Sequence, residues 1–120
     1  MAIDNISSEE LARIVYEALE EKNGVDIKVL NLKNIDSAVS DYFIICNSKN
    51  NPHAEALQDI VLENALKSGN SKPYSLEGVS NSTWRLIDFV DVVVHIFSEE
   101  SREFYNLEKL WADAKTESFA

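Results

Sequence analysis

Apolar residues near the start of the chain recur at helical spacing. Ser7 and Glu10 have the spacing of a capping box, in which both side chains accept hydrogen bonds from backbone amides at the start of a helix. Gly24 is placed to end this helix in a left-handed turn. The residues between form one apolar stripe, which comprises Leu11, Ile14, Val15, Ala18 and Leu19.

The pattern then changes to that of β-strands. Residues 25–32 alternate between apolar and polar up to Val29, whereas Leu30 and Leu32 change parity, which predicts burial on both faces toward the end of the strand. Residues 42–46 form an uninterrupted apolar run. Such a run is typical of a central strand that is covered on both sides.

A second helix is expected after this run. Asn51 suits the N-cap, and Pro52 suits the first helical position, where the amide that proline lacks is not needed. Gly69 is the expected end of this helix. Its apolar face comprises Leu57, Ile60, Val61 and Ala65.

The remaining chain predicts three strands and one closing helix. The strands are expected at residues 74–77, 84–88 and 92–97. Alternation in the second of them places on one face Trp84, Leu86 and Asp88, and on the other Arg85 and Ile87. Ser98 is the expected N-cap of the closing helix, whose apolar positions are Phe104, Leu107, Leu110, Trp111 and Ala114.

These elements follow the order αββαβββα. This order predicts one α/β (α+β) domain over residues 1–120, in which helices flank a mixed β-sheet. The core is expected between about residues 7 and 114.

Charge narrows the possible partners. Eleven Lys and Arg against twenty-one Asp and Glu give a net charge of −10. Proteins that bind nucleic acids or anionic membranes do so through basic patches, so the composition favours basic proteins or neutral small molecules as partners. The first ten residues lack the pattern of a signal peptide, and no apolar stretch is long enough for a membrane span, so a cytoplasmic location is expected.

No catalytic pattern is complete. A single cysteine, Cys46, excludes an intramolecular disulfide, and two histidines are too few for most zinc sites. His95 lies in an apolar strand, where it could act as a general base but is better interpreted as structural, bonded to Asp88, Asp91 or a backbone carbonyl. We therefore expect no catalytic residue, no metal and no cofactor.

Asp88 and Asp91 flank a tight connection and allow three interpretations. They could hold Mg²⁺ for a nucleotidyl-transferring enzyme, cap the turn between two strands, or form an acidic surface that recognises Arg or Lys of a partner. The turn is preferred over the metal site. Trp84, Tyr105 and Trp111 lie in the same third of the chain and are residue types that dominate interface hot spots, although they could equally fill a core.

Residues 84–95 read W-R-L-I-D-F-V-D-V-V-V-H, and residues 102–111 read R-E-F-Y-N-L-E-K-L-W. These blocks closely resemble the patterns W-x-L-x-D-x-x-D-x-V-V-H and R-x-x-Y-x-L-E-x-L-W of the Iojap family, the ribosomal silencing factors. Residues 41–46 and the pair Glu77-Gly78 resemble the D-Y-F-V-I-C strand and the E-G turn of the same family. The resemblance covers about residues 11–114.

The resemblance implies a nucleotidyltransferase-like fold without the catalytic motif of that fold. It also implies binding to the large ribosomal subunit through its fourteenth protein (uL14), which blocks joining of the small subunit and lowers translation when nutrients are short. Free members are expected to be homodimers. A homodimeric scaffold for another basic protein is the remaining alternative. The motif positions expected to form the partner or dimer surface are Trp84, Asp88, Asp91, His95, Tyr105, Leu107, Glu108 and Trp111.

The chain departs from the family at two places. After the apolar strand many members carry S-G-x-S-x-R-Q, whereas this chain has Asn47, Ser48, Lys49, Asn50, Asn51, Pro52 and His53. Asn106 also replaces a common Asp, which removes one negative charge from the expected contact region.

Overall fold

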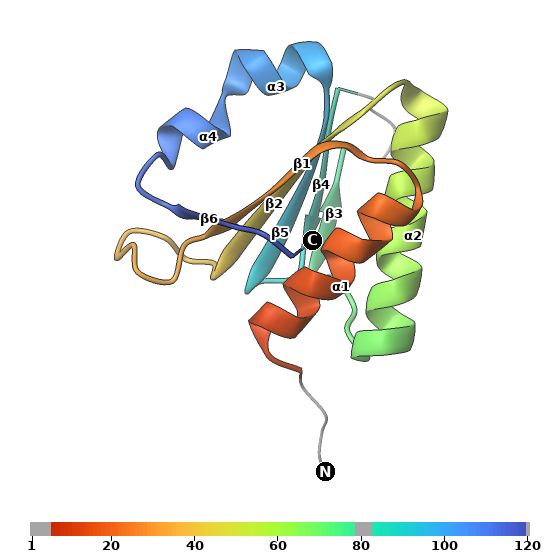
Figure 1. The fold of residues 1–120 in the computed structure, drawn as a ribbon. Helices are drawn as coiled ribbons and strands as arrows, with labels where there is room; N and C mark the ends of the chain where they lie inside the picture. The colour runs from red at the N-terminus through yellow and green to blue at the C-terminus, as the bar shows by residue number, and fades with distance from the viewer. Residues whose placement is uncertain (1–5, 79–82, 120) are drawn as a thin grey trace.

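The computed structural model describes residues 6–78 and 83–119, which form one sheet with helices on both of its faces (Figure 1). The helices are α1 (Ser8–Glu21), α2 (Asn51–Gly69), α3 (Glu99–Tyr105) and α4 (Leu107–Leu110). The strands are β1 (Val25–Asn31), β2 (Tyr42–Ser48), β3 (Ser75–Glu77), β4 (Trp84–Asp88), β5 (Val92–Ser98) and β6 (Lys115–Glu117). The predicted mixed α+β class is confirmed.

The strand order across the sheet is β3-β4-β5-β2-β1-β6. The two central strands, β2 and β5, run parallel, and every other pair is antiparallel. Both central strands are buried along almost their whole length, as their continuous apolar sequences predict. The sheet therefore has two covered faces at its centre.

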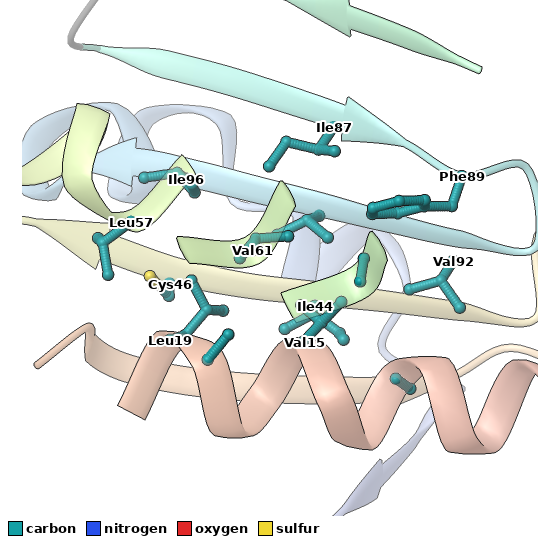
Figure 2. Packing of buried hydrophobic residues seen from close by; sticks show 14 of the residues in the cluster. Val15, Leu19, Ile44, Cys46, Leu57, Val61, Ile87, Phe89, Val92 and Ile96 are labelled. Carbon is teal, nitrogen blue, oxygen red and sulfur yellow. The ribbon is translucent and has the colours of Figure 1, made fainter. Parts of the chain in front are cut away.

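One face of the sheet packs against α1 and α2 (Figures 1 and 2). Their apolar stripes meet alternate residues of the strands, so that side chains from both layers fill one continuous core. Among its fully buried members are Val15, Leu19, Ile44, Leu57, Val61, Ile87, Val94 and Ile96. We call this side of the sheet the helix-covered face.

Asparagine occupies positions that flank α1 and α2. The left-handed residue that follows α1 is Asn23 (φ 61°), and Gly24 lies outside the left-handed region, so the prediction for Gly24 was wrong. Helix α2 is capped by the Asn50 side chain, which accepts a hydrogen bond from the His53 amide (2.8 Å), one residue before the predicted cap. The same helix ends at Gly69, as predicted, and the left-handed residue that caps it is Asn70, with φ 48°. Asparagine tolerates the left-handed region better than most other non-glycine residues, which explains Asn23 and Asn70, whereas Asn50 has an extended backbone and caps through its side chain.

The closing helix is not continuous, contrary to prediction. Asn106 adopts φ 46°, ends α3 and caps α4 through its side chain, so the apolar positions of one expected helix are divided between two short ones. Phe104 and Leu110, both expected on the apolar stripe, are 81% and 70% exposed.

The chain continues after α4 into β6, which adds a sixth strand at the free edge of β1. The Asn31 amide donates a hydrogen bond to the Glu117 carboxylate (2.8 Å) beside this pair. Phe119 then packs against Tyr16 of α1, with ring centroids 5.9 Å apart. Within the part of the chain that the structure describes, no helix combines the length and the apolar composition that crossing a membrane requires.

Candidate functional site

Aromatic rings gather on the sheet face opposite α1 and α2. Trp84 lies at their centre, with its ring centroid 4.5 Å from Tyr105, 5.0 Å from Phe97 and 6.0 Å from His95. Phe43 bridges His95 and Trp111, at 4.8 and 5.9 Å. We call this group of six rings and their surface the aromatic face.

Sheet register explains why these residues meet. Trp84 of β4 lies directly opposite Phe97 of β5, and Leu86 lies opposite His95. The period of two along each strand keeps Trp84, His95 and Phe97 on the same side. The alternation predicted for β4 is confirmed, because Arg85 and Ile87 are buried on the other side. Trp84, His95, Tyr105 and Trp111 are thus brought together, as the sequence blocks suggested.

His95 is a buried neutral histidine that orients Trp84. The indole Nε1 of Trp84 donates to Nδ1 of His95 at 3.1 Å, so the predicted partners Asp88, Asp91 and a backbone carbonyl were wrong. Burial lowers the pKa of His95 to about 4. Its Nε2 has no hydrogen-bond partner within residues 6–78 and 83–119. A histidine with so low a pKa is a poor general base near neutral pH.

The two aspartates lie away from the rings. Asp88 ends β4, about 13 Å along the strand from Trp84 at the usual rise per residue, and its Oδ1 accepts a hydrogen bond from the Val90 amide (2.7 Å). Val90 has φ 77°, as a tight turn requires, and the Asp91 carbonyl accepts from the Tyr42 amide at 3.1 Å. The turn interpretation is confirmed for the Asp88 side chain, whereas Asp91 takes part in the turn through its backbone. In the described residues no cluster of three or more His, Cys, Asp or Glu could hold a metal ion.

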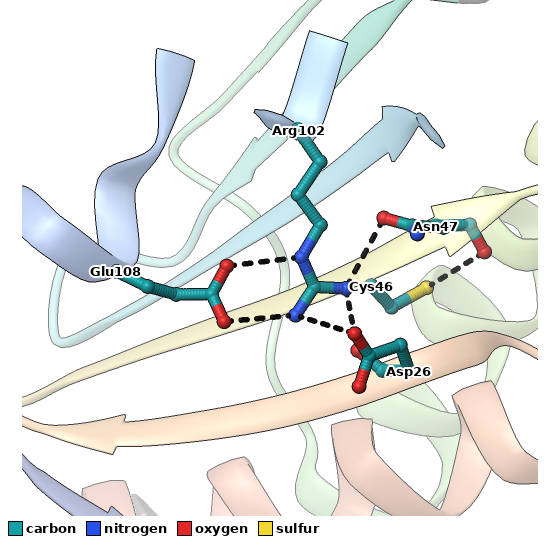
Figure 3. A network of polar contacts seen from close by, with 5 residues as sticks. All are labelled: Asp26, Cys46, Asn47, Arg102 and Glu108. Carbon is teal, nitrogen blue, oxygen red and sulfur yellow. Dashed lines mark hydrogen bonds and ion pairs between the residues drawn. The ribbon is translucent and has the colours of Figure 1, made fainter. Parts of the chain in front are cut away.

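Arg102 is the main residue that sequence reasoning missed. It is buried on α3, and its guanidinium binds both carboxylate oxygens of Glu108, with Nε to Oε1 at 3.1 Å and Nη2 to Oε2 at 3.2 Å (Figure 3). Its Nη1 also donates to Asn47 Oδ1 (3.1 Å) and to the Asp26 carbonyl. The spacing of Arg102 and Glu108, two polar matches in one sequence block, was the only signal for this cluster.

Leu107 and Trp111 face inward from α4. Both pack, partly buried, against a second small core under the aromatic face, whose fully buried members are Leu30, Leu32, Ile45 and Phe97. Tyr105, at 48% exposure, lies at the border of the aromatic face beside the exposed Phe104, with ring centroids 5.1 Å apart, and Leu110 of α4 is also exposed. The sequence pattern predicted one unbroken helix with Phe104 and Leu110 on its apolar face, so their exposure was not expected.

Cys46 and Arg85 are both buried in the interior of the protein. Burial raises the pKa of the Cys46 thiol to about 12, which makes it unreactive near neutral pH. Arg85 reaches α2, where it donates to Asn51 Oδ1 (2.8 Å) and Gln58 Oε1 (3.3 Å). Neither residue contributes to an exposed site. The aromatic face thus combines rings, exposed apolar side chains and acidic neighbours, an arrangement suited to binding a protein.

Comparison with known proteins identifies the family. Residues 5–120 match the family model described as ribosomal silencing factor during starvation (RsfS). The chain belongs to the ribosomal silencing factor family. A member from Halalkalibacterium halodurans, named as such a factor, is 37% identical over 111 residues, which cover 92% of this chain and 93% of that protein.

Two further relatives agree in structure or in sequence. A crystal structure of a protein from Chromobacterium violaceum matches with a TM-score of 0.83 and 30% identity, covering 96% of this chain and 93% of that chain. A protein from Mus musculus, named mitochondrial assembly of ribosomal large subunit protein 1, is 28% identical over 110 residues, or 90% of this chain and 48% of that protein.

The loop that departs from the silencing factor pattern has a structural use in this chain. Asn50 caps α2, and His53 accepts a hydrogen bond from the Lys49 amide through Nδ1 (2.9 Å). The other ring nitrogen of His53 lies 2.8 Å from the Lys22 carbonyl oxygen, at the end of α1. The loop therefore ties the start of α2 to α1 on the helix-covered side. Asn106, the other departure, provides the left-handed break between α3 and α4.

Proposed function

We propose that this ribosomal silencing factor binds the large ribosomal subunit, prevents the small subunit from joining, and so represses translation under nutrient limitation. The docking partner is a basic ribosomal protein, the fourteenth of the large subunit (uL14). Family membership supports the regulatory role. The name of the mouse relative associates that protein with the ribosomal large subunit, which supports the choice of subunit.

The exposed part of the aromatic face is the observation that carries the proposal. Tyr105 contacts the half-buried Trp84 and the exposed Phe104, and the exposed Leu110 directly precedes the half-buried Trp111. Large apolar side chains grouped on a surface mark interaction sites, and Trp and Tyr contribute strongly to binding energy. No reaction is needed for such a surface to exclude the other subunit.

Charge selects the kind of partner. The chain carries −10, and the first turns of α3 expose Glu99, Glu100 and Glu103 near the aromatic face. Such a surface attracts Lys and Arg of a basic protein and is repelled by phosphate backbones. The acidic rim therefore favours a ribosomal protein over the rRNA that surrounds it.

The proposal is tested by mixing purified protein with separated ribosomal subunits and resolving the products on sucrose gradients. Excess protein is expected to cosediment with the large subunit and to reduce the peak of whole ribosomes. An undiminished peak at saturating protein contradicts the proposal.

A matched pair of variants locates the surface. Tyr105→Ala is expected to weaken cosedimentation at least tenfold, a hot-spot effect of about 1.4 kcal/mol or more. Leu66→Ala removes a side chain of α2 with nearly the same exposure, 47% against 48%, and is expected to bind normally. Equal binding by both variants would mean that the aromatic face is not the docking surface.

Asp88 and Asp91, which lie away from the rings, form the outer edge of the proposed surface. Asp88→Lys reverses a charge at the end of β4 and is expected to weaken binding. Normal binding of this variant restricts the contact to the aromatic face. For the free protein we propose a homodimer, which sedimentation equilibrium tests directly; a single species of 13.5 kDa would exclude it.

The enzymatic alternative has a separate test. A nucleotidyl-transferring reaction would need Asp88 to bind Mg²⁺, yet its carboxylate already caps the turn at Val90. Calorimetry with Mg²⁺ and nucleoside triphosphates is expected to show no binding heat. Saturable heat that Asp88→Asn abolishes would restore the enzymatic interpretation.

A further inference from the structure

We propose that Arg102 is the positioning residue of the recognition surface, and that Glu108 acts through Arg102 and not by contacting the partner. This inference rests on the proposed function, since it concerns how the same surface is kept in shape. It reassigns Glu108, which the sequence blocks placed among the contact residues.

The helices that carry the exposed rings cannot hold their position alone. Helix α3 has seven residues and α4 has four, and α4 contains no fully buried residue. Helices of this length are unstable in water without tertiary contacts. The left-handed Asn106 between them also makes their relative orientation depend on contacts outside the backbone of either helix.

Arg102 supplies these contacts from a buried position. Its guanidinium ties α3 to three other segments (Figure 3). It binds Glu108 of α4, Asn47 of β2, and both the carbonyl and the carboxylate of Asp26 in β1. The planar fork meets Glu108 in a bidentate arrangement, which fixes orientation as well as distance. The ion pair to Asp26 is looser, at 3.6 Å, and that carboxylate is more exposed.

Arg102 and Glu108, which we call the clamp, each lie close in sequence to one ring of the aromatic face. Tyr105 follows Arg102 by three residues on α3, and Trp111 follows Glu108 by three residues. Residues three apart lie on adjacent parts of a helical surface. Fixing Arg102 to Glu108 therefore fixes the placement of Tyr105 against Trp84 and of Trp111 against Phe43.

Glu108 has little capacity left for a partner. Its side chain is 35% exposed, and both carboxylate oxygens are bonded to Arg102. Glu103, on the same stretch of chain, is exposed and makes no ion pair within the described ranges 6–78 and 83–119. A partner's cation can pair with Glu103 without disturbing the surface, whereas pairing with Glu108 would leave the buried Arg102 without its best counter-ion.

Three variants separate positioning from direct contact. Glu108→Gln and the control Glu55→Gln, at an exposed position of α2, each remove one negative charge, whereas Arg102→Lys leaves the charge at −10 but removes the fork. Affinity for purified large subunits is measured together with the ¹⁹F spectrum of protein labelled with 5-fluorotryptophan, whose two tryptophan signals are assigned with Trp111→Phe. Urea unfolding confirms that each variant is folded.

We expect Glu108→Gln and Arg102→Lys each to weaken binding roughly tenfold, within the range for coupled side-chain networks. Both should move the Trp111 signal toward its unfolded position. The double variant should bind about as well as either single one, because both break the same contact. Glu55→Gln should change affinity by less than about threefold, as exposed charges do, and leave the Trp111 signal in place.

The opposite pattern overturns the inference. Weak binding by Glu108→Gln with normal binding by Arg102→Lys and an unmoved Trp111 signal would show that Glu108 touches the partner. A moved signal with unchanged affinity would show that the clamp does not control recognition. Should the wild-type protein fail to bind large subunits, the proposed function falls, while the ¹⁹F signals of the free variants still decide whether Arg102 positions Trp111.

Discussion

The two faces of the sheet are built by different means. On the helix-covered face, helices of 14 and 19 residues close over the strands, and the side chains between them are almost all buried and apolar. On the aromatic face, helices of seven and four residues leave rings partly exposed, and directional contacts from His95 and Arg102 hold them. The first arrangement maximises buried apolar area, and the second keeps a surface available in a defined shape.

The difference assigns separate tasks to the two faces. Substitutions on the helix-covered face should change the free energy of unfolding, and substitutions on the aromatic face should change binding. Four predictions test this separation.

The largest loss of stability is expected from Leu57→Ala on α2. Leu57 is fully buried in the core of the helix-covered face. Truncation of a buried leucine removes apolar contacts and leaves a cavity, so the free energy of unfolding should fall by about 3 kcal/mol. Urea denaturation measures the loss, and subunit binding of the folded fraction should be unchanged. A loss below about 1 kcal/mol would show that this face is not the main source of stability.

His95 should make stability depend on acidity from the aromatic face. Its pKa is about 4 in the folded protein and about 6.5 when unfolded, so between these values only the unfolded chain binds the proton. The free energy of unfolding should therefore be highest above pH 6.5 and fall by up to about 3 kcal/mol as the pH decreases to 4.

The matched variant for this test is His95→Gln, whose amide oxygen can still accept from Trp84 Nε1. Unfolding curves at pH 7 and pH 4.5 should show a larger loss for the wild-type protein than for the variant. Equal losses would mean that other groups cause the acid sensitivity.

Gly78→Ala should affect both faces of the sheet, because Gly78 lies against the start of β4, whose side chains point to both faces. Gly78 has φ 70°, and a Cβ there would lie 2.2 Å from the Trp84 carbonyl oxygen. A non-glycine residue held at this backbone angle typically lowers the free energy of unfolding by about 1–3 kcal/mol. Relief of the clash must also displace the start of β4. We expect reduced stability in urea and a changed Trp84 fluorescence. An unchanged Tm would contradict the close approach.

The smallest effect on stability is expected from Phe104→Ser. Phe104 is mostly exposed on α3, so its loss should alter the free energy of unfolding by less than about 0.5 kcal/mol. Cosedimentation with large subunits should nevertheless weaken, which would be the clearest separation of the two tasks. Normal cosedimentation would exclude Phe104 from the surface.

The sequence predicted the central part of the fold well. Continuous apolar runs such as residues 42–46 are typical of strands covered on both sides, and residues 42–46 are such a strand. The capping box at Ser7 and Glu10 is also present in the structure. The end of the chain was harder. Phe104, Leu107 and Trp111 fit one helical stripe, but the left-handed Asn106 turns α4 so that Leu107 and Trp111 face inward while Phe104 faces solvent.

The candidate site was predictable only in part, for a related reason. Trp84, His95 and Tyr105 belong to recognisable blocks, and strand register brings them together. The role of Arg102 depends on Asp26 and Asn47, which are far away in sequence and meet it only in the folded chain. Local periodicity contains no information about such partners.

The parallel pairing of β2 and β5 has a consequence for the order of events during synthesis. Tyr42 pairs with Val92, and a large part of the chain, including all of α2, lies between them. Long-range parallel pairing forms slowly, because the loop must close before its contacts stabilise it. The centre of the sheet cannot form until the ribosome has made β5. A growing chain therefore has neither a finished core nor an aromatic face until β5, α3 and α4 have been made.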